Sequence, residues 1–282
     1  MLAALLFFAA MDVVAKFLAQ TFAVPLLVWA RYLVNCVLML IFVTPTTRSQ
    51  MLVTERPWMH VARSLLLVGT TFCMITALGS MPLAETTAIG FTAPLIVSLL
   101  AGTFLNEKMG RVRWFAVVIG FAGVLVIARP SGALSGTGTL LALGAAICNG
   151  AYQIFTRKMS PTENTTTMIF YTALIGALVM SLTLPWFFGG TMPSLFQMLL
   201  IASLGINGLI GQYLMARAFR RAPASTLAPF TYSQMVWAML LGWIVFDQLP
   251  DALSLVGMLI IVCSGVAVVW LERRPVTPMD DF

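Results

Sequence analysis

The chain has 282 residues, of which 60% are hydrophobic and only 9% are charged. A mean hydropathy of +0.96 lies outside the range of soluble globular domains and indicates a membrane protein. Ten spanning helices of about 20 residues each would leave about 80 residues for loops and tails. This excludes a soluble catalytic domain. The net charge of +6 is explained by the positive-inside rule, and no basic block suggests nucleic acid as a partner.

Apolar stretches bounded by proline, glycine or charged residues predict an all-α membrane protein with ten transmembrane helices. The expected spans are residues 2–20, 23–44, 60–79, 83–105, 112–129, 137–156, 165–187, 195–217, 223–246 and 252–271.

The distribution of lysine and arginine predicts the orientation in the membrane. If both termini are cytoplasmic, Arg129 alone among the 16 Lys and Arg residues falls in an external segment, and Lys16 and Arg31 fall within spans. All the others then lie on the cytoplasmic side, as the positive-inside rule requires. We therefore expect a multi-pass protein of a cell inner membrane with both ends in the cytoplasm.

A weak internal repeat aligns Ala77 with Ala218 and Pro82 with Pro223. The repeat predicts two five-helix units, residues 1–133 and 134–274, followed by a cytoplasmic tail, residues 275–282. Because five is odd, the two units must cross the bilayer in opposite directions. Inverted repeats of this kind are typical of secondary transporters, whose substrate site lies near the midplane where the repeats meet.

Three segments of the first unit carry a family resemblance. The run 77–95 (ALGSMPLAETTAIGFTAPL), together with 104–108 (FLNEK) and 120–124 (GFAGV), resembles the EamA domain of the drug/metabolite transporter superfamily. The second unit looks like another copy, although Gln248 stands where the first has Glu107. The resemblance implies a ten-helix carrier of small metabolites, and the YddG-type amino-acid exporters are the subgroup it suggests.

Asp12 and Lys16 lie four residues apart within the first span. Charges at this depth must be paired or hydrated. One interpretation is an ion pair within the helix, with the lysine reaching toward the outer interface. The other is a role in substrate binding or proton coupling. Arg31, deep in the second span, is expected to be a structural partner between helices.

Two helical stripes occupy matching positions of the two units and predict opposite walls of a cavity. Glu85 opens the first stripe but should be solvated near the outer surface. Polar residues on two other spans are further candidates, whereas Gly205, Gly208 and Gly211 fit helix packing. Prolines inside spans are candidate gates. The candidate cavity residues are Asp12, Lys16, Thr92, Ile96, Tyr152, Gln212, Phe230, Ser233 and Trp237, and the candidate gates are Pro94 and Pro229.

These features favour a secondary transporter that exports small metabolites, most plausibly neutral or aromatic amino acids, by alternating access. A multidrug, nucleobase or other metabolite carrier of the same fold is an alternative, as is an intramembrane lipid-modifying enzyme. The sequence lacks a phosphate-binding loop and the HExxH and GxSxG motifs, and it has one histidine. We therefore expect no catalytic residue, cofactor or metal site. The expected partners are a small-molecule substrate and the lipid bilayer, with a monomeric carrier.

Overall fold

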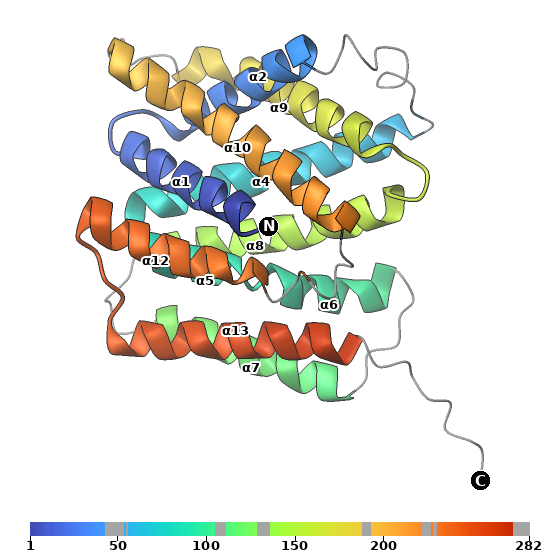
Figure 1. Ribbon diagram of the computed structural model, residues 1–282, viewed down its shortest axis with the longest axis vertical. Helices are drawn as coiled ribbons and strands as arrows, with labels where there is room; N and C mark the ends of the chain where they lie inside the picture. Colours follow the sequence, from blue (N-terminus) through green and yellow to red (C-terminus); the bar gives the residue numbers. More distant parts are fainter. Residues whose placement is uncertain are drawn as a thin grey trace.

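The computed structural model describes residues 1–42, 54, 56–104, 111–128, 136–187, 193–221, 227 and 230–272. All regular elements within these ranges are helices (Figure 1). They are α1 (Leu2–Ala19), α2 (Val24–Phe42), α4 (Pro57–Ser80), α5 (Leu83–Gly90), α6 (Ala93–Phe104), α7 (Arg111–Ala128), α8 (Gly136–Met159), α9 (Thr165–Phe187), α10 (Leu195–Arg221), α12 (Ser233–Phe246) and α13 (Ala252–Glu272).

The helices fall where the apolar stretches predict them. In the described part of the chain, 7 segments are long and apolar enough to cross a membrane. Three shorter apolar helices, 114–128, 233–246 and 252–268, occupy the other expected spans. The all-helical membrane fold is therefore confirmed. The beginning of the expected span 223–246 lies largely outside the described residues.

The expected span 83–105 is interrupted rather than continuous. Helix α5 ends at Gly90 and α6 begins at Ala93, with Phe91 and Thr92 between them. Pro94 is the second residue of α6, where a missing N–H is tolerated, and it offers no donor to the carbonyl of Gly90. The proline thus marks a break between two half-helices instead of a bend within one helix.

The bundle is held together by pairs formed between its two sequence halves. Helix α7 packs along α13, α2 along α9, α4 along α8, and α1 along α10 (Figure 1). Further contacts join α2 to α10 and α4 to α9, and join α1 to α12 and α6 to α8. Glycine permits the closest of these approaches: a Cβ atom at Gly123 on α7 would lie 2.9 Å from the backbone oxygen of Gly257 on α13.

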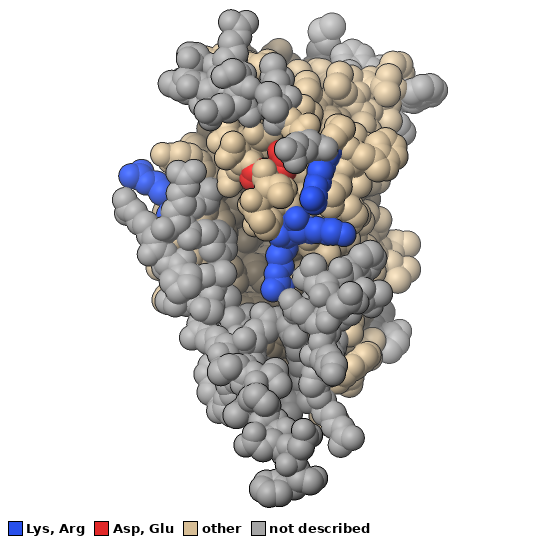
Figure 2. Space-filling view, turned by 90° about the vertical axis from the view of Figure 1, so that its right-hand side faces the viewer, with Lys and Arg blue, Asp and Glu red and all other residues tan. Residues whose placement is uncertain are grey.

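One end of the bundle carries exposed cations. Helix α4 begins there, and α8 and α10 end there, so Arg56, Arg157, Lys158 and Arg217 gather at the same end. Figure 2 views the molecule from this side and shows Lys and Arg side chains close to acidic ones. At the opposite end, the turn between α12 and α13 carries Asp247 and Asp251.

Candidate functional site

A buried carboxylate on α1 is joined to α12. Asp12 is buried, and its Oδ2 atom accepts a hydrogen bond from Nε2 of Gln234 at 3.2 Å. Arg31 on α2 is the cation that acts electrostatically on this carboxylate. Charges within a membrane protein need such partners, because lipid cannot solvate them. Asp12 therefore faces the interior of the bundle, where three helices meet.

Arg31 is only partly satisfied by its surroundings. Its Nη1 atom donates to Oγ1 of Thr71 at 3.1 Å, and the hydroxyl of Tyr32 lies 3.0 Å from the same oxygen. The Nε atom of Arg31 is buried and has no hydrogen-bond partner among the described residues. An unpaired buried donor costs about 1–3 kcal/mol. The guanidinium therefore has an unused N–H group that a bound solute could accept.

Asn35 and Gly208 lie beside this guanidinium. Asn35 follows Arg31 by one turn of α2, is only 5% exposed, and its Oδ1 atom has no partner in the described structure. Gly208 on α10 faces both residues, since a Cβ atom there would lie 3.7 Å from Nε of Arg31 and 3.8 Å from Nδ2 of Asn35. Asp12, Arg31, Asn35, Gly208 and Gln234 define what we call the central polar cluster.

Trp237 extends the cluster along α12. It lies one turn beyond Gln234, and its indole Nε1 atom is buried without a partner among the residues described. An indole combines a flat apolar face with one N–H donor. The central polar cluster and Trp237 together present donors, acceptors and an aromatic ring on α1, α2, α10 and α12, and α1 packs against both α10 and α12. This arrangement suits a small organic solute.

The expected ion pair between Asp12 and Lys16 is wrong. The Lys16 ammonium donates to the backbone oxygens of Leu78, at 3.2 Å, and of Met81. It also lies 5.3 Å from the ring centroid of Phe246. Carbonyl groups at a helix C-terminus lack partners within the helix and carry partial negative charge, which attracts the ammonium. Lys16 therefore closes the end of α4 and turns away from Asp12.

Tyr152 lies in a second polar cluster, around Arg63. The guanidinium donates to the Tyr152 hydroxyl at 2.7 Å, to Oγ1 of Thr156 at 2.7 Å, to Oγ1 of Thr172 at 2.8 Å and to the Met168 carbonyl at 2.9 Å. It also lies 4.6 Å from the centroid of the Tyr152 ring. These bonds join α4, α8 and α9 near the basic end of the bundle. They favour a structural role for Tyr152 here.

The expected stripe on α5 and α6 faces other helices rather than an open cavity. Thr92 is fully buried, and its hydroxyl donates to the Ile89 carbonyl at 2.7 Å. Ile96 packs on α8 so closely that a Cβ atom at Gly150 would lie 2.8 Å from its Cγ2 atom. Glu85, expected to be solvated, is buried, and its Oε2 atom has no partner in the described residues. Its position near Lys16 and under α13 explains the difference.

The remaining candidates are dispersed. Gln212 is half-buried on α10, one turn beyond Gly208 and on the same face. Phe230 is 50% exposed. Ser233 is half-buried and donates to the Phe230 carbonyl at 2.7 Å, a local bond at the start of α12. Pro229 lies outside the described residues.

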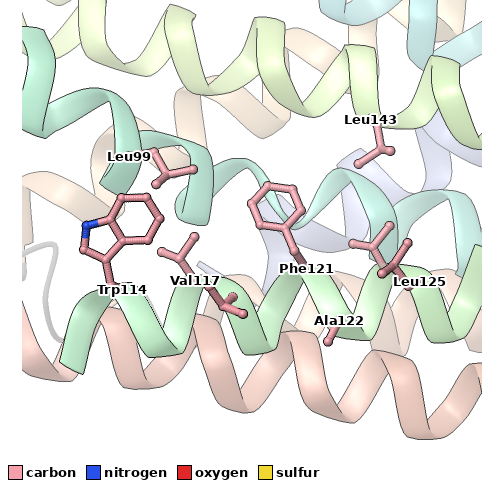
Figure 3. Close-up of a pocket in the computed structure, with 9 residues that line it drawn as sticks. Leu99, Trp114, Val117, Phe121, Ala122, Leu125 and Leu143 are labelled. Carbon is pink, nitrogen blue, oxygen red and sulfur yellow. The ribbon is translucent and has the colours of Figure 1, made fainter. Parts of the chain in front are cut away.

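A separate groove lies on the outside of the bundle, between α6, α7 and α8 (Figure 3). Its walls are apolar apart from the Trp114 indole, and Leu125 on its rim is 70% exposed. A surface of this kind faces lipid tails in a membrane protein. It lacks the convergent polar groups that would orient a polar solute, so the central polar cluster is the better candidate.

Sequence reasoning missed Asn35 and Gln234 and assigned Gly208 to packing. Asn35 could have been found, because it lies on the same helical face as Arg31, four residues away. Gln234 was hidden by the repeat alignment, which selected its neighbour Ser233. Nothing in the sequence distinguishes Gly208 from Gly205 and Gly211, since the three are evenly spaced.

Comparison with known proteins decides the family. The sequence profile of the EamA-like transporter family matches residues 1–129 and 136–270. The chain belongs to this family. Its EamA-type relatives include an S-adenosylmethionine uptake transporter of Rickettsia bellii, 28% identical over 93% of this chain and 89% of the relative. A riboflavin transporter of Vibrio cholerae is 30% identical over 97% of this chain and 93% of the relative.

A solved structure supports the same fold. It superposes with a TM-score of 0.66 at 20% identity and covers 98% of this chain and 99% of its own. Family membership confirms a multi-pass membrane transporter rather than an enzyme. These relatives are named for S-adenosylmethionine and riboflavin, so they do not support the YddG-type subgroup.

Proposed function

We propose that this EamA-family protein is a secondary transporter that carries small organic metabolites through the bacterial inner membrane by alternating access. The observation that carries the proposal is the central polar cluster, where Arg31, Asn35 and neighbouring Trp237 present buried polar atoms without partners. Leaving such atoms unpaired is unfavourable unless a ligand completes them. The cluster lies where helices of both sequence halves meet, as substrate sites of secondary transporters do.

The architecture we propose is a pair of inverted five-helix repeats, residues 1–133 and 134–274. The two separate family matches, one in each half, support this division. The packing supports it too. In the two repeats α1 corresponds to α8, α4 to α10 and α6 to α12. Exchanging the halves therefore turns the packed pair α4–α8 into the packed pair α10–α1, and the pair α1–α12 into the pair α8–α6. The break between α5 and α6 supplies the half-helix ends typical of such carriers.

The orientation we propose places both termini in the cytoplasm, with the carrier acting as a monomer. Its support is the set of exposed cations at the end where α4 begins and α8 ends (Figure 2), because cytoplasmic segments are enriched in Lys and Arg. Lys16 and the turn after α4 then lie on the external side.

The state we propose is closed to the outside. At the external end α1 packs on α4, and Lys16 bonds to the α4 terminus. The counterpart pair, α8 and α10, is not packed together in this way in the described part of the chain. In an inverted repeat, this asymmetry corresponds to a carrier that opens toward the cytoplasm.

The substrate class we propose is an organic metabolite with a heteroaromatic ring. Two relatives are named for S-adenosylmethionine and riboflavin, which both contain one. Trp237 offers an indole face that can stack on such a ring. Neutral and aromatic amino acids have weaker support, because they follow from the resemblance to YddG-type exporters alone.

Counterflow in proteoliposomes tests the function. Vesicles with purified protein and a high internal concentration of one unlabelled solute should accumulate the same labelled solute from outside, whereas protein-free vesicles should not. The panel is S-adenosylmethionine, riboflavin, adenine, phenylalanine and alanine. Chemical conversion of the label would indicate an enzyme, and equilibration without overshoot would indicate a channel. Failure of every solute to show overshoot would contradict the proposal.

A further inference from the structure

The three evenly spaced glycines of α10 have different surroundings. A Cβ atom at Gly205 would lie 2.6 Å from the Val34 side chain, and one at Gly211 would lie 2.6 Å from the Phe8 ring. Both distances are shorter than ordinary Cβ contacts, so close helix packing explains these two glycines. A Cβ atom at Gly208 would approach no atom closer than 3.5 Å, the sulfur of Met11. Helix packing therefore does not explain the glycine at position 208.

Gly208 faces polar atoms that the protein does not satisfy. Nε of Arg31 and Nδ2 of Asn35 would be the other neighbours of a Cβ atom there. Nε of Arg31 and Oδ1 of Asn35 are both buried without a partner among the described residues, and Asn35 as a whole is 95% buried, since it is 5% exposed. A glycine that packing does not require, beside one unpaired donor and one unpaired acceptor, suggests that these polar atoms serve a ligand.

We propose that Asn35, Arg31 and Gly208 form the contact that binds the hydrogen-bonding edge of a heterocycle. A primary amide presents a donor and an acceptor side by side, and it pairs in a bidentate manner with a base edge that offers the complementary groups, such as that of adenine. The N–H group of Arg31 supplies another donor for a ring nitrogen or a carbonyl. The missing Cβ of Gly208 lets a flat ring approach the backbone of α10.

This inference rests on the proposed function and narrows its substrate class. Adenine in S-adenosylmethionine and the imide of riboflavin each place an acceptor next to a donor on the ring edge. An α-amino acid without a heterocycle would be held differently, with its carboxylate at Arg31 and its ammonium group at Asp12. Such a ligand would not need the amide of Asn35.

The test compares binding by three variants of the full-length protein. Asn35→Leu removes the amide at similar volume, and Gly208→Ala adds a methyl group where the ring would lie. Gly144→Ala is the matched control, because a Cβ atom at this glycine of α8 would meet Cys73 Sγ at 3.7 Å, a similarly relaxed distance. Dissociation constants for S-adenosylmethionine, riboflavin and phenylalanine are measured by titration calorimetry on purified protein, with thermal unfolding as the check of folding.

The wild type should bind at least one of the two heterocyclic probes. Asn35→Leu should weaken that binding by about tenfold or more, because it leaves a buried polar group of the ligand unpaired. Gly208→Ala should weaken it to a similar extent, because its methyl group occupies the place of the ring. Gly144→Ala should bind as the wild type does. Gly208→Ala keeps the test valid if Asn35→Leu does not fold.

Three results would overturn the inference: unchanged heterocycle binding in folded Gly208→Ala, wild-type binding of phenylalanine alone, or binding of none of the probes. The proposed function fails separately, through absence of counterflow for the whole panel. A carrier that exchanges solutes but binds heterocycles normally in both variants would therefore contradict the inference and leave the transport function standing.

Discussion

The side-chain nitrogen of Lys16 on α1 lies 3.2 Å from the carbonyl oxygen of Leu78 in the last turn of α4. These residues are 62 positions apart, and the bond closes the end of the bundle opposite to the exposed cations. It replaces the local pairing with Asp12 that the four-residue spacing suggests. Lys16 and Asp12 therefore have independent functions, which mutations can separate.

We predict that Lys16→Met lowers stability by about 1–3 kcal/mol, because carbonyl groups at the α4 terminus lose their donor in a buried place. The measurement is thermal unfolding of purified protein in detergent. Lys16→Arg, which keeps a cation and several donors, is the matched control and should be less destabilised. Adding Asp12→Asn should not restore the stability of Lys16→Met. Restoration by the double substitution would show that the two charges are coupled after all.

We predict that Asp12→Asn separates exchange from accumulation. Asp12 is the buried carboxylate of the central polar cluster, held by the neutral donor Gln234 at 3.2 Å. A carboxylate at this depth can carry a proton through the transport cycle, whereas asparagine cannot. Counterflow needs no net proton movement, so its overshoot should still be measurable in this variant. Accumulation driven by a pH gradient should be lost, and its persistence in this variant would exclude Asp12 as the coupling group.

Topology gives a prediction that tests the inverted arrangement. In a background without the four native cysteines, single cysteines are introduced at Ser80, at Ser160 and at the end of α10, positions 220–221. A membrane-impermeant thiol reagent should label the first position from the outside of intact cells and the other two only after the membrane is opened. Ser80 and Ser160 are both exposed, so accessibility is matched. Labelling of position 80 and positions 220–221 from the same side would contradict the inverted repeat.

We predict that Tyr152 contributes to stability rather than to substrate affinity. Tyr152→Phe removes the hydroxyl that accepts from Arg63 at 2.7 Å but keeps the ring under the guanidinium. Loss of one hydrogen bond to a charged group costs about 1.5–3 kcal/mol. Thermal unfolding should therefore shift downward while the apparent KM of counterflow stays constant. A raised KM at unchanged stability would place Tyr152 at the substrate instead.

Sequence reasoning predicted the helices well because each span must be apolar over its whole length. The boundaries of α5 (Leu83–Gly90) and α6 (Ala93–Phe104) show the limit, since Pro94 indicated a disturbance but not an interruption of two residues. Side-chain direction was harder to predict. Lys16 is placed by carbonyl groups on another helix, and Asp12 by an amide 222 positions away, and no local spacing encodes either contact.

The candidate site was predicted less completely for a related reason. Matching stripes on two spans describe helical faces, but they do not say which neighbour covers each face. Helix α8 covers Ile96 through Gly150, so the first stripe became a packing surface. On α12, the residue beside the predicted Ser233 reaches Asp12. Trp237 was named because the repeat alignment places it on the second stripe, and its buried indole Nε1 atom has no partner among the described residues.

Trp237 and Thr92 lie on the two different stripes, and we predict that their substitutions affect transport differently. Trp237→Ala should reduce counterflow by about tenfold or more at equal protein amount, because it removes an aromatic face and an unpaired N–H beside the central polar cluster. Thr92→Val should transport at nearly the wild-type rate. The Thr92 hydroxyl is a second, local donor to the Ile89 carbonyl. Losing this bond should therefore cost less than losing a contact to the substrate. Trp237→Phe, which keeps a ring without the N–H, separates stacking from hydrogen bonding. Equal loss of transport in Trp237→Ala and Thr92→Val would restore the interpretation of two stripes as opposite walls of one cavity, and normal transport in Trp237→Ala would move the substrate away from α12.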